Sequence, residues 1–302
     1  MEFIETLING LSLGGTYAMI ALGYTMVYGI AKMLNFAHGD IIMVGAYALL
    51  VTLTSWGNPW LGFVVAVLFC MILGVTVEKI AYKPLRGASP LAVLITAIGV
   101  SSLLKSIAQI IFGTGQQPVP VMNALFKDGA KQSIVLDFGN KGNLIVEYYI
   151  LITLISTTAV MIALTLFVKK TKTGRAMVAV SEDRGAAQLM GINVNRIIMI
   201  TFAIGSALAA VAGILMMMKG TPVLPTTGGK PGIKAFTAAV IGGIGSIPGA
   251  MLGGILIGFI ETITAVFPKI TPYTEAIEFL FLIVILLVKP TGMLGKVRRE
   301  KV

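Results

Sequence analysis

The sequence predicts an all-α polytopic membrane protein, a helical bundle of eight or nine membrane segments, some of them short or discontinuous. Of its 302 residues, 56% are hydrophobic, and the mean hydropathy is +0.92. Only 12% of the residues are charged, whereas soluble domains carry about 25%. The apolar runs are long and continuous, which favours membrane helices over the alternating strands of a barrel.

Nine apolar segments follow one another along the chain. They cover residues 7–27, 41–54, 61–81, 91–112, 148–168, 197–218, 233–247, 250–267 and 276–288. The second and seventh are shorter than the roughly 20 residues that cross a bilayer as a helix. The 35 glycines suit the close approach of helices in lipid. We therefore expect one transmembrane domain over residues 1–302.

The charges of the connecting loops predict the orientation of the chain. Basic residues concentrate near Lys83 and Arg86, in residues 169–196 and in the tail, residues 289–302, whereas the loop 113–147 is neutral overall. Because basic loops stay on the cytoplasmic side, nine crossings from an outside N-terminus to a cytoplasmic C-terminus satisfy every loop. An eight-crossing bundle, in which residues 233–247 dip in and return, is the alternative. The net charge of +10 thus indicates contact with membrane lipid and not with nucleic acid.

The basic loop 169–196 contains a short helix signal. Ser181 is the expected N-cap, Glu182 and Asp183 suit the first turn, and Gly191 suits a left-handed end. An apolar face is expected on one side of this helix. The helix either lies on the membrane or on the base of the bundle, or it docks a cytosolic partner. The candidate docking residues are Ser181, Glu182, Asp183, Arg184, Ala186, Ala187, Leu189, Met190 and Gly191.

Two polar or glycine-rich breaks interrupt the apolar pattern. The first, NFAHGD at residues 35–40, either caps a helix start or begins a discontinuous helix whose N-terminus faces a transport path. The second, residues 242–254, either allows close helix packing or forms another broken helix. The candidate path residues are Asn35, His38, Gly39, Asp40, Gly243, Gly245, Ser246 and Glu261.

Two ionisable residues lie inside predicted spans. Glu261, in the eighth segment, is either a hydrogen-bond partner in helix packing or a gate residue. Lys105 lies near the outer end of the fourth segment, so that snorkelling of its ammonium is the favoured interpretation.

Several kinds of chemistry lack their sequence signature. One histidine and one cysteine, Cys70, do not make a typical transition-metal site, and we expect no catalytic residue and no metal ligand. The Gly-Lys pair in residues 228–232 lacks the P-loop pattern. Paired carboxylates typical of proton-coupled carriers are not evident in the spans. Uphill transport would then need energy from another subunit, although an ATP-independent channel or carrier and a membrane enzyme remain alternative classes.

The spacing of AAQLMG, residues 186–191, resembles the "EAA…G" loop of ABC importer permeases, which inserts into a cleft of the ATPase subunit. Gly185 stands where that motif has glutamate. Longer stretches resemble the LivH-type permeases of branched-chain amino-acid ABC importers. These stretches are residues 10–40, EKIAYKPLRG (78–87), residues 181–213, residues 234–254 and KPTGMLG (289–295).

The resemblance runs nearly end to end, with the loop 113–147 as its unfamiliar part. It implies a permease domain in a prokaryotic inner membrane, with residues 181–191 as a cytoplasmic coupling helix. The expected partners are a related LivM-type permease, two cytosolic ATPase subunits that hold ATP and Mg²⁺, and a periplasmic binding protein. The implied substrates are leucine, isoleucine and valine, with another amino acid, urea or a short amide as the alternatives.

Overall fold

The computed structural model describes residues 2–126, 133–137 and 143–295. Its elements, in chain order, are α1 (Glu2–Ala31), α2 (His38–Trp56), α3 (Pro59–Val77), the π-helix η1 (Glu78–Tyr82), the 3₁₀ turn η2 (Lys83–Leu85), α4 (Pro90–Phe112), α5 (Val121–Leu125), β1 (Ser133–Asp137), β2 (Asn143–Glu147), α6 (Tyr148–Lys170), α7 (Lys172–Glu182), α8 (Arg184–Leu189), α9 (Val194–Met218), α10 (Gly229–Gly242), α11 (Ile247–Val266), the 3₁₀ turn η4 (Thr271–Tyr273) and α12 (Thr274–Val288).

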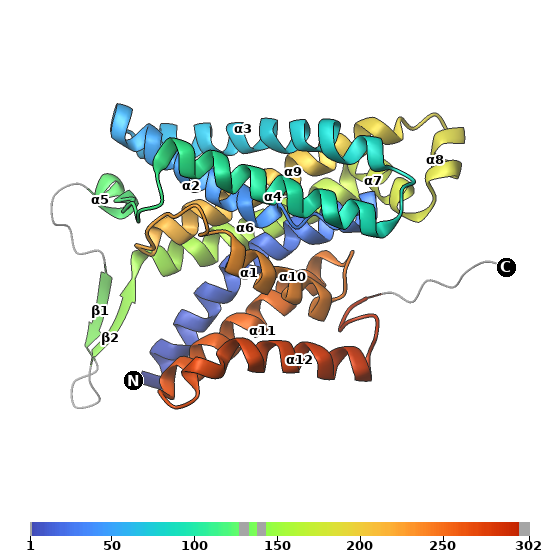
Figure 1. Cartoon of the computed structure of the whole chain (residues 1–302). Helices are drawn as coiled ribbons and strands as arrows, with labels where there is room; N and C mark the ends of the chain where they lie inside the picture. Colours follow the sequence, from blue (N-terminus) through green and yellow to red (C-terminus); the bar gives the residue numbers. More distant parts are fainter. Residues whose placement is uncertain (1, 127–132, 138–142, 296–302) are drawn as a thin grey trace.

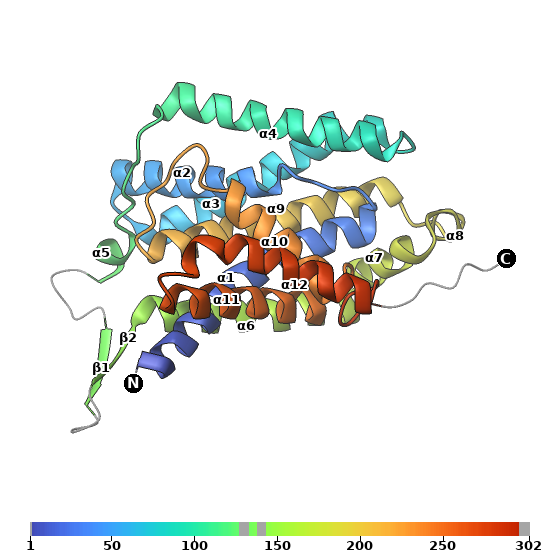
Figure 2. The same ribbon diagram turned by 60° about the horizontal axis from the view of Figure 1, so that its bottom comes forward.

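The long helices run roughly side by side, and the short elements gather at the two ends of the bundle (Figures 1 and 2). The antiparallel pair β1–β2 and α5 lie at one end, which we call the hairpin end. The helices α7 and α8 lie at the opposite end, which we call the α8 end. Seven helices in the described residues are long and apolar enough to cross a membrane. This confirms the all-α polytopic class.

Local capping explains where several long helices begin. The side chains of Asn58, Ser89 and Ser246 each accept a hydrogen bond from a backbone N–H in the first turn of α3, α4 and α11. A proline follows each cap within the first two helical positions, where its missing N–H leaves no bond unmade. Cap and proline together fix the helix starts within one to three residues of the predicted spans.

Helix α1 forms the centre of the bundle and packs against α11, α9, α10 and α6. Its tightest crossing is with α11. An added Cβ on Gly254 would lie 2.4 Å from the Cα of Ala18, and one on Gly258 would lie 2.2 Å from the backbone nitrogen of Gly14. Small residues therefore let the two backbones meet, as in other lipid-embedded helix pairs.

The connections contain more structure than the sequence pattern predicts. The predicted loop 113–147 contains α5 and the strands β1 and β2, which pair from Ser133↔Glu147 to Asp137↔Asn143. The predicted loop 169–196 contains two helices, α7 and α8. In α7, buried Gly174, Met177 and Val180 recur every three residues, which gives this helix an inner face that packs on α6 and α9.

Candidate translocation pathway and coupling segment

The break between α1 and α2 lies inside the bundle. Asn35, 3% exposed, accepts a hydrogen bond of 2.8 Å from the hydroxyl of Tyr82 in η1. The buried ring of His38 packs edge-on against Tyr24, with ring centroids 4.6 Å apart. Gly23 makes room for this ring, because an added Cβ there would lie 2.4 Å from Nε2 of His38. The break between α1 and α2 is therefore buried, and the side chains of Tyr82 from η1 and Tyr24 from α1 hold it.

Asp40 carries a charge into this interior. It is 2% exposed and lies in the first turn of α2, where a carboxylate stabilises the helix dipole. The ammonium of Lys105 lies 3.5 Å from Oδ1 of Asp40. The snorkelling interpretation of Lys105 is therefore wrong: α4 lies beside α2, and the nearest acidic partner draws the ammonium inward.

Helix α10 begins against the same break. An added Cβ on Gly39 would lie 2.5 Å from the carbonyl oxygen of Gly228, and one on Gly232 would lie 2.9 Å from the Cα of Gly39. The starts of α2 and α10 thus touch through backbone alone. With 14 residues, α10 is about 21 Å long, shorter than the hydrocarbon core of about 30 Å. The short helix α10 and the start of α2 therefore meet inside the bundle, and helix ends that meet within the membrane recur at the sites of transporters.

The glycine-rich turn 243–246 lies at the other end of α10. Gly243 and Gly245 have φ of +99° and +95°, a region that favours glycine. Ser246 caps α11 by accepting from the backbone N–H of Gly249 at 3.2 Å. An added Cβ on Gly29, near the end of α1, would lie 3.3 Å from the Cα of Gly245. The turn therefore packs closely against the end of α1.

A half-polar cavity of about 290 Å³ joins this turn to the coupling segment. Its walls include Gly245 and Ser246 from the turn, Ser181 and Glu182 from α7, and Thr25 from α1. The structure thus brings together residues of two predicted site groups that are 63–65 positions apart in sequence. Asn35 and His38 line a separate, much smaller cavity beside α10.

Glu261 lies apart from both groups, in an ionic network among four helices. Lys234 of α10 donates to Glu261 of α11 at 2.7 Å and to Glu278 of α12 at 3.2 Å. The hydroxyl of Tyr17 in α1 also donates to Glu261, at 2.7 Å. Because the side chains of Lys234 and Glu278 are only 11% and 2% exposed, this network fastens α10 to the surrounding helices. Within the described residues no group of three or more His, Cys, Asp and Glu has metal-site geometry.

The candidate coupling segment, residues 181–191, differs from the prediction in where its helix begins. Ser181 is not the N-cap, because α7 continues through it to Glu182; its hydroxyl donates to the carbonyl of Val178 at 2.7 Å. The cap of α8 is Asp183, which accepts from the N–H of Ala186 at 3.0 Å. Gly191 has φ of +79°, as its predicted left-handed role requires.

The faces of α8 are also clear. Ala187 is buried, whereas Ala186, Leu189 and Met190 are exposed, the last two at 89% and 82%. Arg184 is half-buried and reaches back toward α1. The apolar tip of α8 therefore has no cover within the described part of this chain.

The sequence reasoning missed several buried charges that share one signal. Lys234, Glu278 and Glu78 all lie inside predicted apolar spans, where ionisable residues are costly and often functional. Applying that rule to each predicted span would have singled them out. Glu78 pairs with Arg86, eight residues along the chain, whereas the partners of Lys234 are not visible in the sequence, because they lie on other helices.

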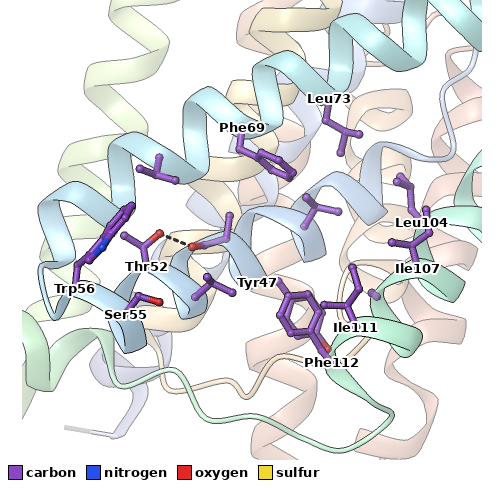
Figure 3. A pocket seen from close by; sticks show the side chains of 15 residues that line it. Tyr47, Thr52, Ser55, Trp56, Phe69, Leu73, Leu104, Ile107, Ile111 and Phe112 are labelled. Atoms are coloured by element: carbon purple, nitrogen blue, oxygen red, sulfur yellow. Dashed lines mark hydrogen bonds between the residues drawn. The ribbon is translucent and has the colours of Figure 1, made fainter.

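An apolar cavity elsewhere in the bundle does not involve any of the predicted site residues. It measures about 450 Å³ and lies between α2, α3 and α4, with Tyr47, Phe69, Leu104 and Phe112 among its walls (Figure 3). The hydroxyl of Thr52 on this wall donates to the backbone carbonyl of Ala48, in the same helix, at 2.7 Å. This apolar lining suits a hydrocarbon chain better than a zwitterionic amino acid.

Comparison with known proteins finds relatives along the whole chain. Residues 6–288 match the family described as "Branched-chain amino acid transport system / permease component". The chain is 41% identical to the high-affinity branched-chain amino acid transport system permease protein BraD of Pseudomonas aeruginosa, over 100% of this chain and 98% of the relative. It is equally identical, with the same coverage, to LivH of Escherichia coli K12, described in the same words. It is 31% identical to a probable LivH of Methanocaldococcus jannaschii, over 92% and 88%.

A solved structure supports the fold alone. PsaBC from Streptococcus pneumoniae, in complex with Fab, matches with a TM-score of 0.50 and 14% identity, covering 96% of this chain and 93% of that chain. The full-length relatives and the family match carry the assignment. The chain belongs to the family of permease components of branched-chain amino acid transport systems.

Proposed function

We propose that this chain is a transmembrane permease subunit of an ATP-binding cassette importer for leucine, isoleucine and valine. The observation that carries the proposal is full-length membership in the family, together with a short helix, α8, that projects exposed Leu189 and Met190 beyond the long helices. In this proposal α8 is the coupling helix for a cytosolic ATPase subunit. ATP and Mg²⁺ belong to the ATPase subunits, and a LivM-type permease completes the membrane part.

The orientation follows from charge and geometry. The α8 end carries the basic loops and is the cytoplasmic side of a prokaryotic inner membrane, and the hairpin end receives the periplasmic binding protein. Backbone N–H groups of Met293 and Leu294, after α12, donate to carbonyls at the end of α10. The ends of α10 and α12 thus lie together, whereas α9 ends at the hairpin end. The chain therefore returns from the hairpin end to the α8 end between α9 and the end of α10. This return counts as a crossing and supports nine crossings with a cytoplasmic C-terminus.

Copurification tests the coupling role. Leu189→Glu and Gly191→Glu place a charge on the apolar tip or force a side chain into a left-handed conformation, so that each should abolish ATPase association while membrane insertion stays normal. Arg175→Glu, an exposed position on α7, is the matched control. Normal assembly and uptake in both tip variants would exclude the docking role of α8.

Ligand-stimulated ATP hydrolysis tests the substrate. The assembled complex is reconstituted with its binding protein, and leucine, isoleucine, valine, another amino acid, urea and a short amide are each added. Stimulation by the three branched-chain amino acids alone is expected. Stimulation by another ligand would change the substrate but not the class. Concentrative uptake by this chain alone, without ATP, would show a channel or carrier instead.

A further inference from the structure

At the α8 end of the bundle, two basic residues cap the last carbonyls of helix α1. The last four carbonyls of a helix have no partner inside it. In α1 the first two of these accept from the backbone N–H and the ammonium of Lys32, at 3.0 and 2.5 Å. The last two, of Ile30 and Ala31, accept from the guanidinium of Arg184. A residue 153 positions away thus completes the end of the central helix.

Arg184 is the first residue of α8, and Asp183 caps this helix directly before it. The guanidinium is half-buried and points away from the exposed tip formed by Leu189 and Met190. One short helix therefore carries the candidate docking tip at its end and, at its start, a fastening to the end of α1.

A second set of contacts holds the break that follows α1. Arg86 donates to Asn195 in the first turn of α9 and to Glu78 in η1. The last residue of η1, Tyr82, donates to Asn35 at 2.8 Å. Arg86 and Arg184 line the same cavity, of about 550 Å³, beside α8. The surroundings of α8 thus contact the break 32–37 from two sides, and π-helical turns such as η1 are frequent at functional sites.

We propose that Arg184 is a positioning residue that transmits displacement of α8 to the α1–α2 break, and through it to the starts of α2 and α10. The proposal rests on the proposed function, in which the ATPase moves α8. If α8 moves alone, two backbone carbonyls and a half-buried guanidinium lose their partners, which is unfavourable. Joint movement of α8 and the end of α1 keeps these hydrogen bonds.

The first test compares leucine uptake per ATP hydrolysed in the assembled importer. Because the guanidinium of Arg184 contacts α1 and not the exposed tip, Arg184→Ala should copurify with the ATPase and hydrolyse ATP. It should nevertheless transport at least about tenfold less leucine per ATP, within the usual range of coupling energies. Arg184→Lys keeps a cation near the carbonyls and should restore part of the coupling. Arg196→Ala removes an equal charge from an exposed position in the first turn of α9 and should leave coupling unchanged.

A second readout follows the break itself. Leu34→Cys in a Cys70→Ala background reports on residues 32–37 through its rate of maleimide labelling. ATP should change that rate when Arg184 is present and leave it unchanged in Arg184→Ala.

Unchanged uptake per ATP in Arg184→Ala, or the same ATP-dependent labelling change, would overturn the link, even if the amount of complex falls. Failure of the unsubstituted chain to bind any ATPase would overturn the proposed function together with the link. Normal ATPase binding with normal coupling in Arg184→Ala would overturn the link alone.

Discussion

At the residue scale, the most consequential side chain that sequence reasoning missed is Lys234. It holds two carboxylates at 2.7 and 3.2 Å, and Glu278 is almost fully enclosed. Replacing Lys234 by Met leaves that carboxylate uncompensated, and breaking a buried pair in this way costs about 3–5 kcal/mol. We expect a large fall in the thermal unfolding midpoint of the purified chain in detergent.

The control lies one helical turn away. Lys230 pairs with Glu275 at 2.9 Å, but the two side chains are 81% and 54% exposed, so that Lys230→Met should cost only about 0–1 kcal/mol. Adding Glu278→Gln to Lys234→Met removes the uncompensated charge and should recover part of the loss. Equal midpoints for the two lysine variants would contradict the fastening role of the network.

A second residue-scale prediction concerns the contact between α2 and α10. In Gly39→Ala the new methyl group would lie 2.5 Å from a backbone oxygen, so the two helix starts must separate. Overpacking of this kind costs about 1–3 kcal/mol, and we expect lower uptake as well as lower stability. Gly99→Ala is the control, since its Cβ meets no atom within 4 Å. Wild-type uptake by Gly39→Ala would show that this contact is not needed for transport.

At the element scale, we propose the hairpin β1–β2 as the surface that binds a periplasmic partner. Val135 and Ile145 face each other in its register and are 48% and 52% exposed. The N–H of Ile145 donates to Glu5 of α1 at 3.1 Å, which anchors the hairpin to the bundle. The double variant Val135→Glu, Ile145→Glu should raise the Kd for the loaded binding protein at least about tenfold, a loss typical of apolar anchors.

Binding to reconstituted importer, measured as the binding-protein concentration that half-stimulates ATP hydrolysis, checks this expectation. Met190→Glu at the opposite end should leave that concentration unchanged while weakening ATPase association. If the hairpin variant binds normally, the docking surface lies elsewhere at the hairpin end.

The elements also show which features sequence can predict. Spans were predictable because hydropathy is a local property, and the α1–α2 break was predictable because polar residues 35–40 interrupt an apolar run. The start of α8 was placed two residues early, because Ser181 and Asp183 are both good caps and buried Met177 and Val180 extend α7 past the first. The partners of Lys105 and Glu261 were not predictable, since they depend on which helices become neighbours.

At the scale of the whole molecule, the arrangement of α10 decides how many times the chain crosses the membrane. Cysteines in a Cys70→Ala background report this when intact cells are treated with an impermeant maleimide. Thr226→Cys, exposed in the loop before α10, should be labelled directly, and Gly185→Cys on α8 only after permeabilisation.

Leu294→Cys, after α12 and 44% exposed, discriminates between the nine-crossing and eight-crossing models. With nine crossings it behaves like Gly185→Cys, because Leu294 lines the same cavity as Ser181 of α7, whereas with eight crossings it is labelled directly. Direct labelling of Leu294→Cys would therefore refute the nine-crossing topology. It would also refute the placement of Leu294 and the α8 end on the same, cytoplasmic side.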